Sequence, residues 1–495
     1  MRFSFDDLQL FSAASHDRNP IHVSGEYARK SFYGDQVVFG MLGVLACLGH
    51  VSPPENCVLA KIHVEFPGAM FLGTEYKVTV TQRTDESFSA RLYDGSKLLV
   101  KTEVAFCNGN PGEMEYSGAG RANRRAPADT DEIIEGATVT GEYLPSQPEF
   151  RQLLNRYGLD GRRFDPLQLS TLLCASYIVG MEQPGLRSLF AELSLSFDKS
   201  GFSNPAALVY QSTAASVSAL NAIRASLSVS ANERLLAKGH SLALIIPRAP
   251  VVSVDKVAEL LHPAGRLKGK VALVIGASRG LGAALAAALC LEGCSVIANF
   301  HRSLSEAQEL EKSVSHASGR LILAQGNAAD ISWCEALETR IIAEFGRLDL
   351  VIWNACPPPR PLRIEPSMVN RINSYVDQAL SLVSVPLSLY MDELAKSSGC
   401  GVLVSSVVSS YAENSPKEWP HYVAAKSAVE GLFRVAALQY PGVKLIIARP
   451  PRLRTDMMNT PTSYGNAMLP EVAAARILER ILSAAGAGVD LFSFE

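Results

Sequence analysis

Asp17 and His22 are the first residues whose types and spacing could do chemistry. They lie five positions apart in Asp17-Arg-Asn19-Pro20-Ile-His22, where Asn19-Pro20 interrupts regular structure and keeps both side chains on one short loop. A histidine titrates near neutral pH and can carry a proton in either direction, while a carboxylate can orient it or a water molecule. The pair therefore suits the removal or addition of water beside a carbonyl group.

Tyr422 and Lys426 form a second reactive pair. They stand one helical turn apart, so their side chains share one face of the expected helix. A lysine cation beside a phenol stabilises the phenolate and is expected to lower the phenol pKa from about 10 toward working pH. The tyrosine could then donate its proton to a carbonyl group that receives a hydride.

A glycine-rich turn lies 146 positions before Tyr422, between an expected strand at 271–275 and an alanine-rich helix at 281–291. Its first glycine permits a tight bend, the second lets the backbone approach a pyrophosphate, and the third allows close helix packing. The N-terminus of the helix offers oriented N–H groups to the phosphates. The turn comprises Gly276, Ser278, Arg279, Gly280, Leu281 and Gly282.

The second expected strand ends in Asn299-Phe-His301-Arg302-Ser303, without the Asp or Glu that would bind a ribose 2'-hydroxyl. Arg279 in the glycine turn and Arg302, next to His301, place two guanidinium groups where a 2'-phosphate would lie. The sequence therefore favours NADP over NAD as the cofactor.

The elements that must position Tyr422 alternate between strand and helix along residues 268–495. We expect strands at 271–275, 295–300, 321–324, 348–353, 401–405 and 444–448, with helices between them. This order predicts an α/β Rossmann-type, doubly wound parallel sheet with helices on both faces. A dinucleotide would lie across the carboxyl ends of its strands.

The elements around Asp17 and His22 belong to an internal repeat. Residues 59–66 match residues 190–197 in their period-two apolar pattern, and 98–101 match 235–238. In each copy an apolar helix, at 38–48 or 169–180, precedes alternating strands. The pattern predicts an α+β arrangement in which two open antiparallel sheets pair along an edge.

Length and linkers set the domain organisation. At 495 residues the chain exceeds what one core usually organises, so we expect two or three domains. Segment 108–130 is rich in Gly, Pro, Ala and charged residues and lacks a regular period, which predicts a linker. Segment 247–267 carries Pro247, Pro250, Pro263 and Gly265, which predicts a second one. They separate residues 1–107, 131–246 and 268–495.

Composition excludes several classes of protein. A hydrophobic content of 47% and a net charge of -3 fit a globular protein and give no reason to expect a nucleic-acid partner. The nine cysteines form no C-x-x-C pair, so we expect reduced thiols in a cytoplasmic protein, with no metal site. The N-terminus lacks the features of a signal peptide, and the most apolar stretch, 37–51, falls short of the roughly 20 residues that cross a bilayer.

The first copy of the repeat resembles the hydratase motif of MaoC-like, R-specific enoyl-thioester hydratases and dehydratases. The resemblance rests on residues 11–22, on Ala28 and Phe32, and on residues 38–42. It implies a double hot-dog fold, a catalytic dyad of Asp17 and His22, and a backbone amide at Gly40 that polarises the thioester carbonyl. The second copy, which lacks the dyad, would shape the acyl pocket. The sequence departs from the family pattern at His16, Phe39 and Leu48, where Gly, His and Ser are usual.

Residues 268–495 resemble the short-chain dehydrogenase/reductase family, especially its ketoacyl-thioester reductases. The resemblance implies catalysis by Tyr422, Lys426 and a serine. Ser406 fits the motif if a loop around 410–419 is inserted, whereas Ser409 has the usual spacing from the tyrosine. The implied cofactor contacts are the glycine turn, Asn327, Ala328, Asn354, Ala355, Pro450, Thr455, Tyr422 and Lys426. The sequence departs from the family pattern at Cys356, Pro451 and Gln378, where Gly, Gly and Asn are usual.

Together the resemblances predict a bifunctional enzyme that reduces a β-ketoacyl thioester with NADPH and dehydrates the R-3-hydroxyacyl product. The acyl group would be carried by acyl carrier protein or coenzyme A, in fatty-acid-like or polyketide-like synthesis, and the resemblance implies a homo-oligomer. One alternative runs both steps in the oxidative direction. Another makes the hot-dog half a non-catalytic acyl-binding or dimerising module.

Overall fold

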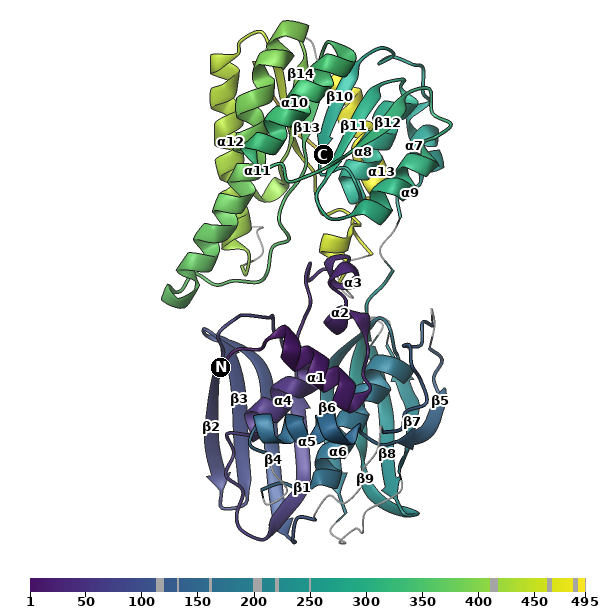
Figure 1. Ribbon diagram of the computed structural model, residues 1–495, viewed down its shortest axis with the longest axis vertical. Coiled ribbons are helices and arrows are strands. Elements are labelled where there is room, and N and C mark those ends of the chain that lie inside the picture. The colour runs from purple at the N-terminus through teal and green to yellow at the C-terminus, as the bar shows by residue number, and fades with distance from the viewer. Residues whose placement is uncertain are drawn as a thin grey trace. The chain divides into compact units, whose positions relative to one another are not determined.

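The structure is a computed structural model that describes residues 1–112, 120–130, 133–159, 163–198, 207–218, 222–248, 251–409, 417–460, 465–483 and 488–494. These residues form two compact units, one of Met1–Pro247 with Thr460–Thr462 and one of Arg248–Asn459 with Ser463–Glu495. The first is built on an antiparallel sheet and the second on a parallel sheet (Figure 1).

The described strands of the first unit form one nine-stranded sheet in the order β2-β3-β4-β1-β6-β9-β8-β7-β5. Every neighbouring pair is antiparallel. The strands span Cys57–Glu65 (β1), Lys77–Thr84 (β2), Ser87–Asp94 (β3), Lys97–Asn108 (β4), Thr138–Tyr143 (β5), Ser188–Phe197 (β6), Leu208–Val217 (β7), Ala222–Ala231 (β8) and Arg234–Ile245 (β9).

The two repeated segments become β1 and β6, which pair at the centre of this sheet. His63 lies opposite Ser194, which is its counterpart in the repeat, so the pairing has a local twofold character. The same register places Glu65 opposite Glu192. Like charges directly opposite weaken a strand pair.

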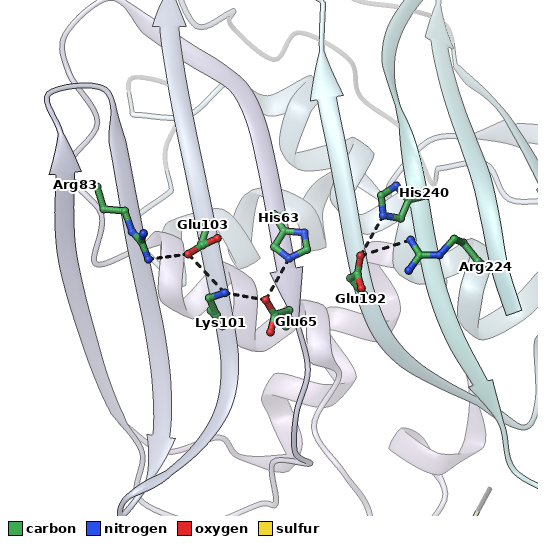
Figure 2. A network of polar contacts seen from close by, with 8 residues as sticks. All are labelled: His63, Glu65, Arg83, Lys101, Glu103, Glu192, Arg224 and His240. Atoms are coloured by element: carbon green, nitrogen blue, oxygen red, sulfur yellow. Dashed lines mark hydrogen bonds and ion pairs between the residues drawn. The ribbon is translucent and has the colours of Figure 1, made fainter. Parts of the chain in front are cut away.

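On the same face of the sheet, basic side chains offset the repulsion between Glu65 and Glu192 (Figure 2). Lys101 Nζ lies 2.8 Å and His63 Nε2 3.2 Å from Glu65 Oε1. On the β6 side of the β1–β6 pair, His240 Nε2 lies 3.1 Å and Arg224 Nη1 lies 3.7 Å from Glu192 Oε1. The hydrogen bond from Lys101 lowers the pKa of Glu65, so this carboxylate is stabilised in its charged form.

The helices of the first unit include two that are buried against the sheet, α4 (Gly40–Leu48) and α6 (Pro166–Tyr177). Every residue of α6 is buried, and so is every residue of α4 after Gly40. A helix that is covered on all sides needs the apolar composition that both segments have. The π-helical turn η1 (Ile178–Glu182) continues α6. The remaining helices are α1 (Phe5–Ser15), α2 (Pro20–Val23), α3 (Gly25–Arg29) and α5 (Gln147–Arg156).

The second unit confirms the predicted parallel sheet. Its described strands run β12-β11-β10-β13-β14-β15-β16, and all neighbours are parallel. They span Val271–Ile275 (β10), Ser295–Phe300 (β11), Arg320–Gln325 (β12), Leu350–Trp353 (β13), Cys400–Val404 (β14), Lys444–Arg449 (β15) and Gly488–Ser493 (β16). The helices are α7 (Val254–Leu261), α8 (Gly280–Leu291), α9 (Leu304–Ser313), α10 (Ile331–Phe345), α11 (Val369–Ser397), α12 (Pro420–Gln439) and α13 (Pro470–Ser483).

The described parts of the two expected linkers contain more regular structure and specific contacts than their composition indicated. Residues 254–261, inside the expected linker 247–267, form α7, which buries Val257 and Leu261 in the core of the second unit. Within 108–130, Arg121 pairs with Leu144 and Arg124 donates to Glu182. Amphipathic spacing in the first case and specific polar contacts in the second outweigh the Gly and Pro content.

Among the described residues, no helix is both long enough and apolar enough to cross a membrane. In the same part of the chain, no three His, Cys, Asp or Glu side chains gather as a metal site. All nine cysteines are free thiols.

Candidate active sites

The loop that carries Asp17 and His22 begins where α1 ends. His16 caps α1 with a φ of 58°, a left-handed conformation that favours the glycine expected from the resemblance. A hydrogen bond between its Nε2 and the Leu144 carbonyl, 3.0 Å long, holds the histidine in this conformation. Asn19 then caps α2 by accepting from the Ile21 amide at 3.2 Å. These two caps fix the path of the loop.

Asp17 is buried in the first unit. Its Oδ2 accepts a hydrogen bond from Ser176 Oγ at 2.9 Å, and its Oδ1 accepts from the Asn19 amide at 3.1 Å. Burial outweighs both bonds and raises the pKa of Asp17 to about 7. The carboxyl group can therefore hold or release a proton near neutral pH.

His22 is held in one tautomer. Its Nδ1 donates to the Val37 carbonyl at 2.8 Å, which leaves Nε2 as the proton-accepting atom of the neutral ring. The ring stacks on Phe39 with 4.0 Å between centroids. Burial lowers the pKa of His22 to about 4, so the ring is neutral at physiological pH. Phe39, where the family has His, thus packs against this imidazole.

No hydrogen bond joins Asp17 and His22: the carboxyl group accepts from Ser176 and the Asn19 amide, and the imidazole Nδ1 donates to the Val37 carbonyl. Gly40, the predicted carbonyl-polarising amide, is the first residue of α4, whose N-terminus has no side-chain cap. The Phe66 ring would lie only 2.9 Å from a Cβ at this position, so only glycine fits without displacing it. Leu48, where the family has Ser, ends α4 and is fully buried in the apolar core of the first unit.

The glycine turn of the second unit is built by close backbone approaches. Gly276 has a φ of 80°, and a Cβ there would lie 2.9 Å from Ala355 Cα. A Cβ on Gly282 would lie 2.0 Å from the Gly276 carbonyl oxygen. Asn354 Nδ2 donates to that same oxygen at 2.8 Å. The end of β13 thus supports the turn, and Ser278 and Leu281 lie between its glycines.

The side chains expected around the adenosine part of a dinucleotide follow β11 and β12. His301 and Arg302 are exposed after β11, and Asn327 is exposed after β12 next to buried Ala328. Arg279 instead forms an ion pair with Asp456, Nη1 to Oδ2 2.6 Å. Its guanidinium would have to exchange this partner, or share it, to bind a phosphate.

Two further predicted contacts lie after β15. The Pro450 carbonyl accepts from the Val407 amide at 3.3 Å. Thr455 approaches the glycine turn, since its Cγ2 would lie 3.1 Å from a Cβ on Gly280. Both residues lie at the carboxyl end of the sheet, because β15 ends at Arg449.

Tyr422 and Lys426 lie on α12. Lys426 Nζ donates to the Val404 carbonyl at 2.9 Å and lies 5.7 Å from the centre of the Tyr422 ring. The Lys426 charge lowers the pKa of Tyr422, but burial has the larger effect and the pKa is raised. The sequence-based expectation of a net decrease is therefore wrong for the protein without ligands, because it omitted desolvation.

The two candidate serines have different partners. A hydrogen bond with Ser406 acts on Tyr422 and favours its phenolate. Ser409 Oγ instead donates to Glu430 Oε1 at 2.6 Å. Ser406 is thus the serine beside the tyrosine. Of the loop insertion expected at 410–419, residues 410–416 lie outside the described residues.

The departures from the family pattern have structural counterparts. Cys356 Sγ lies 3.5 Å from Tyr375 Oη. Gln378, where an Asn is usual, is exposed and donates to Ser374 at 3.1 Å. Pro451 lies next to Pro450 in the segment that follows β15.

Sequence reasoning missed two residues that organise these sites. Glu430 is buried, and its carboxylate accepts hydrogen bonds from Ser405, Ser409 and Arg449. Its position four residues after Lys426 on one helix could have indicated it. Ser176 carried no signal, because its contact with Asp17 spans 159 positions.

Comparison with known proteins addresses the second unit. The family model described as short chain dehydrogenase matches residues 270–463. The 3beta-hydroxysteroid dehydrogenase 1 of Eggerthella lenta is 29% identical over 219 residues, which are 42% of this chain and 78% of that protein. An uncharacterized oxidoreductase of Escherichia coli, YgfF, is 30% identical over 193 residues, which are 38% of this chain and 77% of that protein.

A solved short chain dehydrogenase from Burkholderia cenocepacia, in complex with NADP, is 23% identical to this chain. The alignment covers 46% of this chain and 98% of that one, with a TM-score of 0.41. On the family match and the relatives, the chain belongs to the short-chain dehydrogenase family through its second unit, which is an oxidoreductase domain.

Proposed function

We propose that this protein reduces a β-ketoacyl thioester with NADPH and then dehydrates the resulting R-3-hydroxyacyl thioester. The observation that carries the proposal is the presence, in one chain, of Tyr422 with Lys426 and Ser406 on a Rossmann-type sheet and of Asp17 with His22 in a separate unit. The first unit would be a double hot dog, which fits its continuous antiparallel sheet and the two buried helices α4 and α6.

The residues of the second unit fit NADP. The glycines of the turn permit a close packing of backbone that a Cβ would prevent, and the N-terminus of α8 that follows can offer N–H groups to phosphates. Asn299, at the end of β11, is buried and donates to the Ala324 and Gly326 carbonyls, so no carboxylate there would repel a 2'-phosphate. Arg302 and Arg279 supply positive charge. When bound, NADPH supplies the hydride for the reduction.

Tyr422 would protonate the carbonyl oxygen as the β-carbon receives the hydride. Ser406 would donate a second hydrogen bond to that oxygen, and Lys426 would stabilise the phenolate left on Tyr422. Because Lys426 is buried, its charge acts through a medium of low polarity and is weakly screened. A proton from solvent then restores the phenol, so one hydride and one proton are consumed for each alcohol formed.

Asp17 and His22 would divide the proton transfers of dehydration. Neutral His22 would take the α-proton at Nε2, and protonated Asp17 would give its proton to the departing β-hydroxyl, which leaves as water. The Gly40 amide would stabilise the negative charge that develops on the thioester oxygen. Return of a proton from His22 to Asp17 through solvent restores both groups.

A single chain raises the effective concentration of the intermediate, because one unit's product is the other unit's substrate. The carrier of the acyl group would be acyl carrier protein or coenzyme A. Acetoacetyl and longer β-ketoacyl coenzyme A thioesters, each mixed with NADPH and the protein, test the proposal by product analysis. We expect consumption of NADPH and formation of trans-enoyl thioesters; no oxidation of NADPH with any of them would contradict it.

A further inference from the structure

Three consecutive residues of the loop, Asp17, Arg18 and Asn19, each form hydrogen bonds with the second copy of the repeat. Ser176 Oγ donates to Asp17 Oδ2 at 2.9 Å, and the Arg18 amide donates to Met181 Sδ at 3.1 Å. Asn19 Nδ2 donates to the Gly180 and Gly185 carbonyls at 3.1 and 3.0 Å. These partners come from α6, from the turn η1 and from the residues that follow it.

The turn η1 has the geometry that this contact requires. A π-helical turn widens the helix by one residue per turn, and such turns are frequent at functional sites. Here it brings Gly180 against the carboxyl group of Asp17, so that a Cβ on Gly180 would lie 2.5 Å from Oδ1. Glycine at this position lets the acid approach the backbone of the second copy.

A buried polar cluster anchors the far end of η1. Glu182 accepts from Tyr177 Oη at 2.9 Å and Tyr210 Oη at 3.0 Å, and Arg124 Nε donates to its other oxygen at 2.8 Å. Buried charges of this kind are stable only when they are paired and hydrogen-bonded. The cluster therefore fixes η1, and with it the surface that faces Asp17.

We infer that Ser176 and Gly180 of the second copy are positioning residues for Asp17, which they hold in the orientation of a general acid. The inference rests on the proposed dehydration, and it changes the role of the second copy. Instead of only lining an acyl pocket, that copy completes the acid/base site of the first.

The surroundings of Asp17 make its protonation sensitive to this contact. The groups that act on its pKa are the Asn19 amide and Ser176, and the titratable side chains on its own segment are His16, Arg18 and His22. On the elements packed against it lie Cys174, Tyr177 and Glu182, and Glu182 is paired with Arg124. Since Ser176 stabilises the carboxylate, its removal raises the pKa of Asp17 further.

Ser176→Ala tests the inference, with Ser170→Ala as the matched control. Ser170 is buried on the same helix, but its hydroxyl bonds to the Pro166 carbonyl at 2.8 Å. In the full-length protein, a hydroxyacyl coenzyme A thioester is dehydrated across a range of pH, and the thermal unfolding of each variant shows whether its first unit is folded. We expect dehydration by Ser176→Ala to fall about 10-fold and its pH profile to move up by about one unit. Ser176→Thr should restore both.

Two outcomes overturn the inference: an unchanged pH profile in Ser176→Ala, or equal losses in Ser170→Ala. Gly180→Ala is a second test, because the added methyl group must displace the carboxyl group of Asp17. We expect the rate of dehydration to fall at least 10-fold while ketone reduction persists. If the wild type itself dehydrates nothing, the proposed function fails. The contact between Ser176 and Asp17 is then tested separately by pH-dependent unfolding, in which Ser176→Ala should move the Asp17 transition by about one unit; no movement would show that the contact does not hold the carboxyl group.

Discussion

At the scale of single residues, burial and charge oppose each other at Tyr422. Desolvation raises the pKa of the phenol and the Lys426 charge lowers it. The balance keeps the proton on the tyrosine at physiological pH, which suits an acid that acts only when a carbonyl oxygen becomes basic. In the first unit, burial is the largest effect on both reactive side chains. It raises the pKa of Asp17 and lowers the pKa of His22.

Tyr422→Phe removes the proton donor and leaves the ring in place. We expect the rate of ketone reduction to fall by about 10²- to 10⁴-fold, the usual contribution of general acid catalysis. Tyr440→Phe, at the C-terminal end of the same helix, is the control, since its hydroxyl bonds to Asp392. Single-turnover oxidation of NADPH measures both. Equal rates for Tyr422→Phe and the wild type would exclude Tyr422 as the acid.

Asp17→Asn tests the raised pKa through stability. The unfolded chain releases this proton near its ordinary pKa of 3.8 and the folded chain near about 7. The stability that Asp17 contributes is therefore complete below the lower value and is lost as the pH rises to the upper one. Relative to Asp17→Asn, the wild-type free energy of unfolding should fall by on the order of 1 kcal/mol per pH unit in this window.

His22 acts in the opposite sense, because its folded-state pKa is lowered to about 4 from 6.5. The contribution of His22 to the free energy of unfolding grows as the pH rises between these values and opposes the loss at Asp17. The unfolding free energy of the wild type alone can therefore stay nearly constant across this range. Denaturant titrations at several pH values, compared between wild type and Asp17→Asn, isolate the carboxyl group. A difference that does not change with pH would contradict the raised pKa of Asp17.

At the scale of elements, the parallel sheet follows largely from the sequence. The strand at Val271–Ile275 is predicted residue for residue, because it is an uninterrupted apolar run that ends at a glycine turn and is buried on both faces. β16 (Gly488–Ser493) was missed because it is an edge strand with no fully buried residue. Helix α7 was missed because the prolines around it indicated a linker.

The candidate sites follow from the sequence only in part. Asp17 with His22 and Tyr422 with Lys426 are recognisable, because each pair is close along the chain. The choice of Ser406 over Ser409, the support of Gly276 by Asn354 and the contact of Ser176 with Asp17 depend on tertiary packing. Local spacing carries no information on such contacts.

Gly276→Ala tests the glycine turn as an element. A positive φ and a 2.9 Å approach to Ala355 make the substitution costly, so we expect a loss of about 1 to 3 kcal/mol in unfolding free energy. Gly431→Ala is the matched control, because Gly431 lies in α12 with nothing within 4 Å of its Cβ position. That change should stabilise the protein by roughly 0.5 to 1 kcal/mol. Equal effects would refute the argument from close approach.

Arg302→Ala tests the segment after β11 as a phosphate contact. Loss of a charge-assisted hydrogen bond should raise KM for NADPH by about 10- to 100-fold and leave KM for NADH nearly unchanged. Arg2→Ala, an exposed arginine of the first unit paired with Glu75, serves as the control. Initial rates with each cofactor give the comparison, and equal KM increases for both cofactors would remove the role of Arg302 in the preference.

At the scale of the whole molecule, two units of different architecture share one chain, and each holds its own group of reactive side chains. The antiparallel unit carries groups that suit transfer of protons to and from carbon and oxygen. The parallel unit carries those that suit protonation of an oxygen as a hydride arrives. In the proposed function the two reactions would be consecutive on one substrate, which would give a physical reason for joining the units.

The product formed by His22→Ala distinguishes an enzyme that carries out both steps from one that only reduces. The full-length variant and the wild type receive a β-ketoacyl coenzyme A thioester and NADPH, and the acyl products are separated and quantified. We expect the two proteins to oxidise NADPH at equal rates. The wild type should form enoyl thioester, whereas the variant should accumulate 3-hydroxyacyl thioester because its rate of dehydration is about 10²- to 10⁴-fold lower. Formation of enoyl thioester by both proteins at the same rate would contradict the proposed function.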